Sequence, residues 1–180
     1  MNILIVAATT REIEPFLSYY RENKRAWDVD VLITGVGLLS TSHALTRQLH
    51  LKKPDLVIQA GIAGCFEPKI PLGTVVLVKQ DAVADLGVME NNELRTLFDL
   101  GLVKLNQPPF KKGWLGNPEK ELMKKSGLKV VSAISVNQVS TSKTDIQNLQ
   151  RKFSPVIESM EGAALHYVCL MEKIIQMLFL

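Results

Sequence analysis

Several short segments of this chain are apolar at almost every position, and this feature constrains the fold more than any other. Ile3–Ala8, Asp30–Thr34 and Asp55–Ala60 have the length of strands, and the first two run into apolar residues at helical spacing. Strands that are apolar on both faces belong to sheets that are covered on both sides. Further strands are expected at Thr74–Val78 and Leu128–Ser135, which brings the expected number to at least six. We therefore expect a three-layer α/β/α domain around a central mixed β-sheet.

The composition narrows the class of protein and its partners. A length of 180 residues with 47% apolar content suits one domain over residues 1–180. The net charge is only +3 and the lysine doublets are scattered, so nucleic acid is not an expected partner. No run approaches the ~18 apolar residues of a membrane helix, so no membrane is expected either. Cys65 and Cys169 are too few for a disulfide framework, which fits a reducing cytoplasm.

Two carboxylates lie at a strand-to-helix junction late in the sequence. The apolar run Val156–Ile157 is followed by Glu158 and Glu161 and then by a helical pattern that continues to Leu170. Charges beside a core are costly unless they are paired or used. Glu161 is expected in the first helical turn, near the positive end of the helix dipole. Its role is either structural only, as an acidic residue at a helix start, or functional, and this segment alone does not decide between the two.

A third carboxylate, Glu12, has two interpretations of the same kind. Thr9 and Glu12 follow the first expected strand at the Thr-x-x-Glu spacing of a capping box, which explains Glu12 in structural terms alone. The competing hypothesis is a carboxylate aimed across the C-terminal edge of the sheet, where open α/β sheets bind ligands.

Glycine-rich turns follow two other expected strands, at Gly35–Gly37 and Gly61–Gly64. They allow a ligand to approach the backbone closely, or they serve as tight turns only. A dinucleotide site is disfavoured because Ser40 stands where the third glycine of G-x-G-x-x-G would be.

Other common kinds of site are also disfavoured. The three histidines lack partners at metal-ligand spacing, and neither a P-loop nor a G-x-S-x-G motif is present. We expect no metal and no cofactor. Carboxylates at strand ends remain, and with an activated water they suit glycosidic bond cleavage through a cationic transition state. Residues 81–117 are expected to form a loop-rich excursion with one short helix around Glu93–Leu100.

Four blocks of sequence together carry a family resemblance. They are Ile5–Glu12, Thr34–Gly37, Gln59–Gly64 and Glu158–Ala164. In order and spacing the chain resembles the nucleoside phosphorylase/nucleosidase superfamily over essentially its whole length. Within it, the chain is most similar to futalosine hydrolases of menaquinone biosynthesis, which split futalosine with water into hypoxanthine and dehypoxanthine futalosine. The alternative is the methylthioadenosine/S-adenosylhomocysteine nucleosidase group. The resemblance implies a small-molecule purine nucleoside as substrate and a homodimer as the assembly.

The resemblance also assigns roles to single residues. It makes Glu12 the carboxylate that positions and deprotonates the attacking water. It makes Glu161 the residue that holds the ribose hydroxyls and Met160 the side chain that contacts the sugar. Val139 and Ser140 are expected where the family's chain passes the purine base and reads its edge, largely through backbone groups.

Two positions depart from the family's pattern near the Gly61–Gly64 turn. Ile62, an expected substrate contact, stands where nucleosidases often have serine, which leaves a hydrogen bond there in doubt. Gln59 stands where phosphorylases of the family have an arginine that binds phosphate. The loss of that cation favours water over phosphate as the nucleophile, although Arg11 is another cation nearby.

The third departure is at the end of the sequence. The family has a further strand after the Met-Glu helix, then an Asp or Asn that meets the purine near N7, and another long helix. Here the strand-like tail Ile174–Leu180 is the last segment, without a matching acid. The domain is therefore expected to lack the family's C-terminal strand end and helix. The 180-residue chain is expected to turn over slowly, and a truncated nucleoside-binding relative without catalysis is the alternative.

Overall fold

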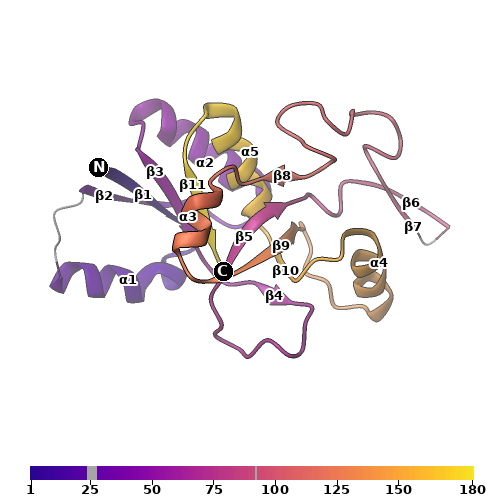
Figure 1. The fold of residues 1–180 in the computed structure, drawn as a ribbon, viewed down its shortest axis with the longest axis horizontal. Coiled ribbons are helices and arrows are strands. Elements are labelled where there is room, and N and C mark those ends of the chain that lie inside the picture. The colour runs from indigo at the N-terminus through magenta and orange to yellow at the C-terminus, as the bar shows by residue number, and fades with distance from the viewer. Residues whose placement is uncertain (24–27, 92) are drawn as a thin grey trace.

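A mixed β-sheet crosses the molecule, with helices on both of its faces (Figure 1). The computed structural model describes residues 1–23, 28–91 and 93–180. The strands run across the sheet in the order β2 (Asp28–Ile33), β1 (Asn2–Ala7), β3 (Leu56–Ala60), β11 (Gln176–Phe179), β5 (Val76–Asp81), β9 (Lys129–Ser135), β10 (Ile157–Ser159) and β4 (Gly64–Cys65), and β8 (Leu115–Gly116) pairs with β5. The expected α/β architecture with a mixed sheet is confirmed.

Apart from the short strands β4 and β8, which pair antiparallel with β10 and β5, the sheet consists of two parallel halves that run in opposite directions. β1 is parallel to β2 and β3, and β11 is parallel to β3. β9 is parallel to β5 and β10 in the second half. The halves meet where β11 pairs antiparallel with β5, with Phe179 opposite Leu77. The strand-like tail of the sequence thus forms a central strand of the sheet.

The alternation of side chains along β1 separates two helical layers. One face of the sheet packs on α1 (Thr10–Glu22), and its buried residues are Ile3, Ile5, Ala7 and Ile13. The other face packs on α2 (Leu38–Leu51) and α5 (Gly162–Glu172), and its buried residues include Leu4, Val6, Leu45, Leu49, Leu165 and Val168. Each fully buried aliphatic side chain stabilises the fold by roughly 1.5–3 kcal/mol. α3 (Lys120–Lys125) contributes Met123 to the first face.

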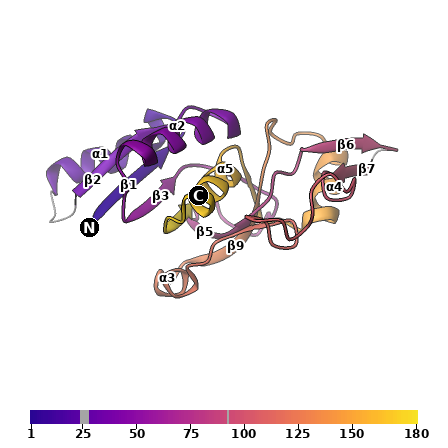
Figure 2. The same ribbon diagram turned by 90° about the horizontal axis from the view of Figure 1, so that it is seen from above.

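One end of the molecule is formed by α4 (Lys143–Phe153) and a hairpin of β6 (Gly87–Glu90) and β7 (Glu93–Thr96), as Figure 2 shows. The helix expected around Glu93–Leu100 is therefore wrong. β7 pairs antiparallel with β6, and a Cβ at Gly87 would collide with the carbonyl of Arg95, so the hairpin needs this glycine. Beyond the strand, the Thr96 N–H and hydroxyl both donate to Asp99 and close a turn. Such local side-chain bonds compete with helix formation.

Candidate functional site

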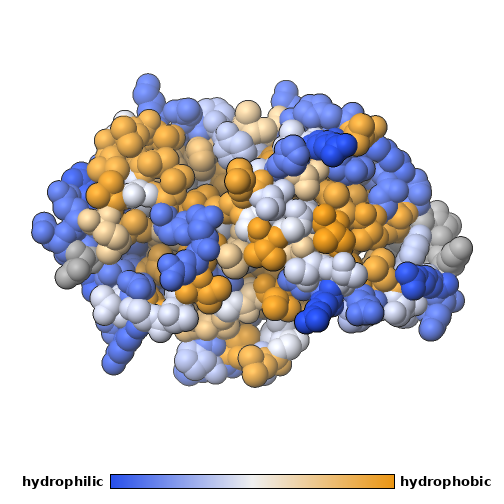
Figure 3. Space-filling view, turned by 180° about the vertical axis from the view of Figure 1, so that it is seen from behind, coloured by the Kyte–Doolittle hydropathy of each residue, from blue (hydrophilic) through white to orange (hydrophobic). Residues whose placement is uncertain are grey.

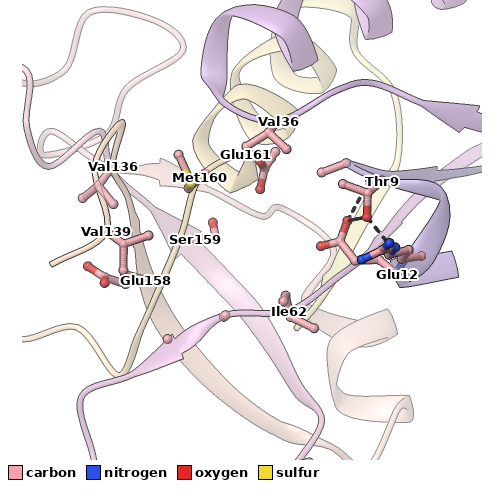
Figure 4. A pocket seen from close by; sticks show the side chains of 14 residues that line it. Thr9, Glu12, Val36, Ile62, Val136, Val139, Glu158, Ser159, Met160 and Glu161 are labelled. Carbon is pink, nitrogen blue, oxygen red and sulfur yellow. Dashed lines mark hydrogen bonds between the residues drawn. The ribbon is translucent and has the colours of Figure 1, made fainter. Parts of the chain in front are cut away.

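A cavity of about 650 Å³ lies where the two halves of the sheet meet (Figure 4). Five short segments line it, and four of them directly follow a strand. They are residues 8–12 after β1, Val36 after β2, residues 62–64 after β3, residues 136–139 after β9 and residues 158–161 at the end of β10. The segment from β3 to β4 passes between the halves, because β3 pairs with β1 whereas β4 pairs with β10. The topology thereby brings Glu12 and Glu161 to one cavity, although they are far apart in sequence.

Glu12 is both a helix cap and a cavity residue. The Thr9 N–H and the Thr9 hydroxyl donate to Glu12 Oε2 at 2.8 and 2.9 Å, and the Glu12 N–H donates back to Thr9 Oγ at 3.4 Å. The capping box expected from the sequence is confirmed. The other oxygen, Oε1, faces the backbone at Gly61, where a Cβ would lie 3.2 Å away. The cap fixes the orientation of the carboxylate, so the structural and the functional interpretation are compatible.

Glu161 is the N-cap residue of α5, yet its side chain makes no bond to that helix. Its Oε1 instead accepts the backbone N–H of Gly37 at 2.8 Å, and the residue is only 7% exposed. Gly37 has a φ of 93°, which favours glycine. Burial raises the pKa of Glu161, and the nearby charge of Glu12 raises it further, against the bonds from the Gly37 and Met160 N–H groups. The two carboxylates thus interact, and the Gly37 N–H holds the Glu161 carboxylate in place.

Glu158 lies at the opposite end of the cavity and organises the neighbouring loop. The Ser140 N–H and hydroxyl donate to its two carboxylate oxygens at 3.0 and 2.7 Å. A Cβ at Gly64 would lie 3.2 Å from Glu158 Cγ, so the absence of a side chain there lets the carboxylate fit. Ser140 itself does not line this cavity, whereas Val139 does. The base-reading role expected for both residues stays a prediction, and both Ser140 donors are directed to Glu158.

The remaining walls are largely apolar. Met160 lies between Glu158 and Glu161 and lines the cavity, and its contact with a sugar stays a prediction. Ile62 lines it as well and is 78% exposed, so it lies at the rim. Val36 and Val136 complete the walls, and sequence reasoning did not single them out. Their common signal is position, since each follows the C-terminal end of a parallel strand.

Positive charge is sparse at this site. Arg11 is the arginine among the cavity-lining residues of the described chain, and no lysine lines it there. Gln59, near the end of β3, is 2% exposed, and its Oε1 has no hydrogen-bond partner among the described residues. Its side chain does not line the cavity. Near the end of β3 the described chain therefore has a buried amide and not a cation.

Two general features of the described chain bear on its chemistry. Within residues 1–23, 28–91 and 93–180, no group of three or more His, Cys, Asp or Glu side chains could hold a metal ion. In those same ranges, no helix has the length and apolar character needed to cross a bilayer.

The cavity has a pair of interacting carboxylates, one of them oriented by a helix cap, and apolar walls. That arrangement suits water activation beside a sugar cation.

Comparisons with known proteins show which proteins this chain is similar to. The family model described as the phosphorylase superfamily matches residues 3–175. The chain is 29% identical to the futalosine hydrolase of Thermus thermophilus over 167 residues, which covers 88% of this chain and 70% of that one. It is 24% identical to a 5'-methylthioadenosine/S-adenosylhomocysteine nucleosidase of Buchnera aphidicola, covering 94% of this chain and 78% of the relative.

Solved structures share the fold of this chain. A futalosine hydrolase mutant of Helicobacter pylori superimposes with a TM-score of 0.79 at 16% identity, covering 99% of this chain and 88% of that chain. A Helicobacter pylori structure named MTAN-D198N, with 5'-methylthioadenosine in its active site, also has a TM-score of 0.79 at 16% identity and covers 99% and 83% of the two chains.

Proposed function

The chain belongs to the phosphorylase superfamily, and we propose that it is an N-glycosyl hydrolase that cleaves a purine nucleoside with water. The observation that carries this proposal is the pair of carboxylates, Glu12 and Glu161, that the fold brings to one cavity. Burial is the main cause of the raised pKa of Glu161, and the charge of Glu12 raises it further.

Futalosine is the substrate that we propose first. The supporting observation is the 29% identity to the Thermus thermophilus futalosine hydrolase over most of both chains. The products would be hypoxanthine and dehypoxanthine futalosine, a step of menaquinone biosynthesis. Methylthioadenosine or S-adenosylhomocysteine is the second candidate, supported by the relatives that match at 24% identity over a larger share of this chain.

In the proposed mechanism, the bond between C1′ of the ribose and the base nitrogen breaks, and the oxygen of a water forms a bond to C1′. Glu12 positions that water and accepts its proton, and the departing purine takes up a proton from solvent. The Thr9 cap holds Glu12 Oε2, which leaves Oε1, near the backbone of Gly61, for the water. Glu161 accepts hydrogen bonds from the ribose hydroxyls, and these strengthen as positive charge grows on the sugar. Met160 contacts the sugar, and Ile62 and Val139 are further residues that we assign to the substrate. Ser140 supports this loop from behind, because its N–H and hydroxyl both donate to Glu158.

Water, rather than phosphate, is the nucleophile in this proposal. Orthophosphate is best held by a fixed guanidinium with paired donors. The buried Gln59 amide does not supply one, and its side chain lies outside the cavity lining. Arg11 does line the cavity, so the experiment must separate the two nucleophiles.

The test is the release of free base from futalosine, methylthioadenosine, S-adenosylhomocysteine and inosine, each without phosphate and with about 10 mM phosphate, which exceeds the usual range of KM values. We expect base release that is independent of phosphate, with free ribosyl product. Phosphate-dependent release with a sugar 1-phosphate would contradict the choice of nucleophile. No release from any purine nucleoside would contradict the function itself.

We also propose that the protein is a cytoplasmic homodimer. Figure 3 shows apolar side chains gathered over the middle of one face of the molecule. At the cavity rim, Val36 and Val139 are each 54% exposed and Ile62 is 78% exposed, which a partner surface would cover. The free thiol of Cys65 is exposed, and such a thiol suits a reducing compartment. Light scattering of the purified chain tests the dimer, and cell fractionation tests the compartment.

A further inference from the structure

Three neighbouring parallel strands each end in a buried polar side chain. β5 ends at Asp81, β9 at Ser135 and β10 at Ser159, and these residues are 0%, 0% and 4% exposed. The three strands are adjacent in the sheet in this order. Buried polar groups next to a core are costly unless hydrogen bonds satisfy them, so this row of three requires an explanation that apolar packing does not provide.

The three side chains converge beneath the N-terminus of α5. The Gly162 N–H donates to Ser159 Oγ at 3.2 Å, and the Ala163 N–H donates to Ser135 Oγ at 2.7 Å. The Ser135 hydroxyl donates to Asp81 Oδ1 at 3.1 Å, and the two serine oxygens are 3.4 Å apart. A continuous hydrogen-bonded chain thus links the first amides of α5 to the Asp81 carboxylate.

The hydrogen bonds of this network all donate toward Asp81. Each serine hydroxyl has a single proton and can accept at its lone pairs. Because Ser135 gives its proton to Asp81, its lone pairs are left for the Ala163 N–H and for the Ser159 hydroxyl. The Asp81 carboxylate, as the last acceptor, therefore determines the direction in which both serine hydroxyls donate. Burial raises the pKa of Asp81 to about 7, against the bonds from Ser135 and the Ala82 N–H, while the positive end of the α5 dipole favours a carboxylate at this position.

These hydrogen bonds cap the N-terminus of α5, which the Glu161 side chain does not do. The first N–H groups of a helix need partners from outside the helix. Ser159 and Ser135 supply them for Gly162 and Ala163, and Glu161 makes no side-chain cap bond. The Glu161 carboxylate is thereby free to accept the Gly37 N–H and to line the cavity.

The fit around Asp81 is close. A Cβ at Gly162 would collide with Asp81 Oδ2 and would lie 2.8 Å from Leu178 Cδ2. The start of α5 therefore rests directly on the carboxylate, and a shift of either group moves the other.

We propose that Asp81, acting through Ser135 and Ser159, is a positioning residue that holds the Met160–Glu161 turn in its binding geometry. The inference rests on the proposed function where Glu161 is taken to bind the ribose. It assigns no contact between Asp81 and substrate, because Asp81 is fully buried and does not line the cavity.

The first experiment is a double-mutant cycle on base release. Asp81→Asn keeps the shape of the side chain, and Ser135→Ala breaks the chain in a second way, in case the first variant folds poorly. We expect each to lower kcat/KM on the order of tenfold, the size of coupling between groups in one network. In a Glu161→Gln background, Asp81→Asn should change kcat/KM by less than about twofold. An equal loss in both backgrounds, or wild-type kinetics for both single variants, would overturn the proposal.

The second experiment does not depend on turnover. The Gly37 N–H is protected by Glu161 and lies on a different element from Asp81, in the connection between β2 and α2. Amide hydrogen exchange at Gly37, followed by NMR, should speed up in Asp81→Asn and in Ser135→Ala, as we expect it to in Glu161→Ala, which removes the acceptor of the Gly37 N–H. Unchanged exchange at Gly37 in both variants would show that the chain does not hold Glu161, even if the wild type cleaves no nucleoside and the proposed function alone has failed.

Discussion

Replacing Glu12 by Gln separates its two proposed roles, because losing a general base changes the reaction rate far more than losing one helix-cap charge changes the free energy of unfolding. Gln retains a carbonyl oxygen that can accept the bonds that Thr9 now donates to Oε2 at 2.8 and 2.9 Å. The helix loses one negative charge in its first turn, a change of about 0.3–1 kcal/mol. Losing the base that activates water lowers the rate by roughly 10²–10⁴-fold, which corresponds to about 3–5 kcal/mol in the barrier.

The assay measures both quantities on the same protein. We expect denaturant unfolding to change by no more than about 1 kcal/mol, the value of a typical cap, while kcat for base release falls by at least roughly 100-fold. Glu14→Gln is the matched control, because Glu14 is exposed on the same helix, outside the cavity lining, and loses the same charge. The control should keep both its rate and its stability.

One result would refute the reasoning about Glu12. If Glu12→Gln unfolds more easily than Glu14→Gln but keeps the wild-type rate, the residue is only a cap, and the general base lies elsewhere in the cavity.

The remaining predictions concern Glu161 and Asp81. Glu161→Gln should raise KM and lower kcat for a purine nucleoside, because a neutral amide binds the ribose hydroxyls less strongly as the sugar becomes cationic; an Ala variant with normal kinetics would contradict this role. Asp81→Asn should also change how stability depends on pH. The folded pKa of about 7 lies above the ordinary value of 3.8, so the folded state binds more protons between these values, and Asp81 makes stability fall as pH rises through that window. The difference corresponds to about 4 kcal/mol, and urea unfolding from pH 4 to 8 should show a flatter profile in the variant than in the wild type; parallel profiles would contradict the raised pKa.

Local sequence patterns predicted the parts of this structure that depend on local chemistry. The apolar run at the N-terminus forms β1, and the Thr-x-x-Glu spacing forms the capping box of α1. The hairpin of β6 and β7 was missed because its pairing depends on the close approach of Gly87 to Arg95, which no periodicity shows. The side-by-side placement of Glu12 and Glu161 likewise follows from the order of the strands rather than from either segment.

The buried chain beneath α5 combines residues that no local window contains. Asp81 and Ser135 are 54 residues apart, and each looks like an ordinary polar residue at the end of an apolar strand. Only the adjacency of β5, β9 and β10 brings them together. A polar residue that ends a strand buried on both faces is nevertheless a signal, because such a position is costly unless a partner exists.

One local signal at Glu161 could have been read from the sequence. Ser159 Oγ accepts the N–H of the residue three positions later, as Thr9 does in α1 and Ser142 does in α4. In α1 that third residue is Glu12, whose carboxylate returns the bond and completes the capping box. In α5 it is Gly162, which has no side chain to return a bond, and Asp81 lies where a Cβ would be. The first two N–H groups of α5 are therefore satisfied without the Glu161 side chain, which makes no cap bond, so its buried position toward Gly37 and the cavity requires another purpose.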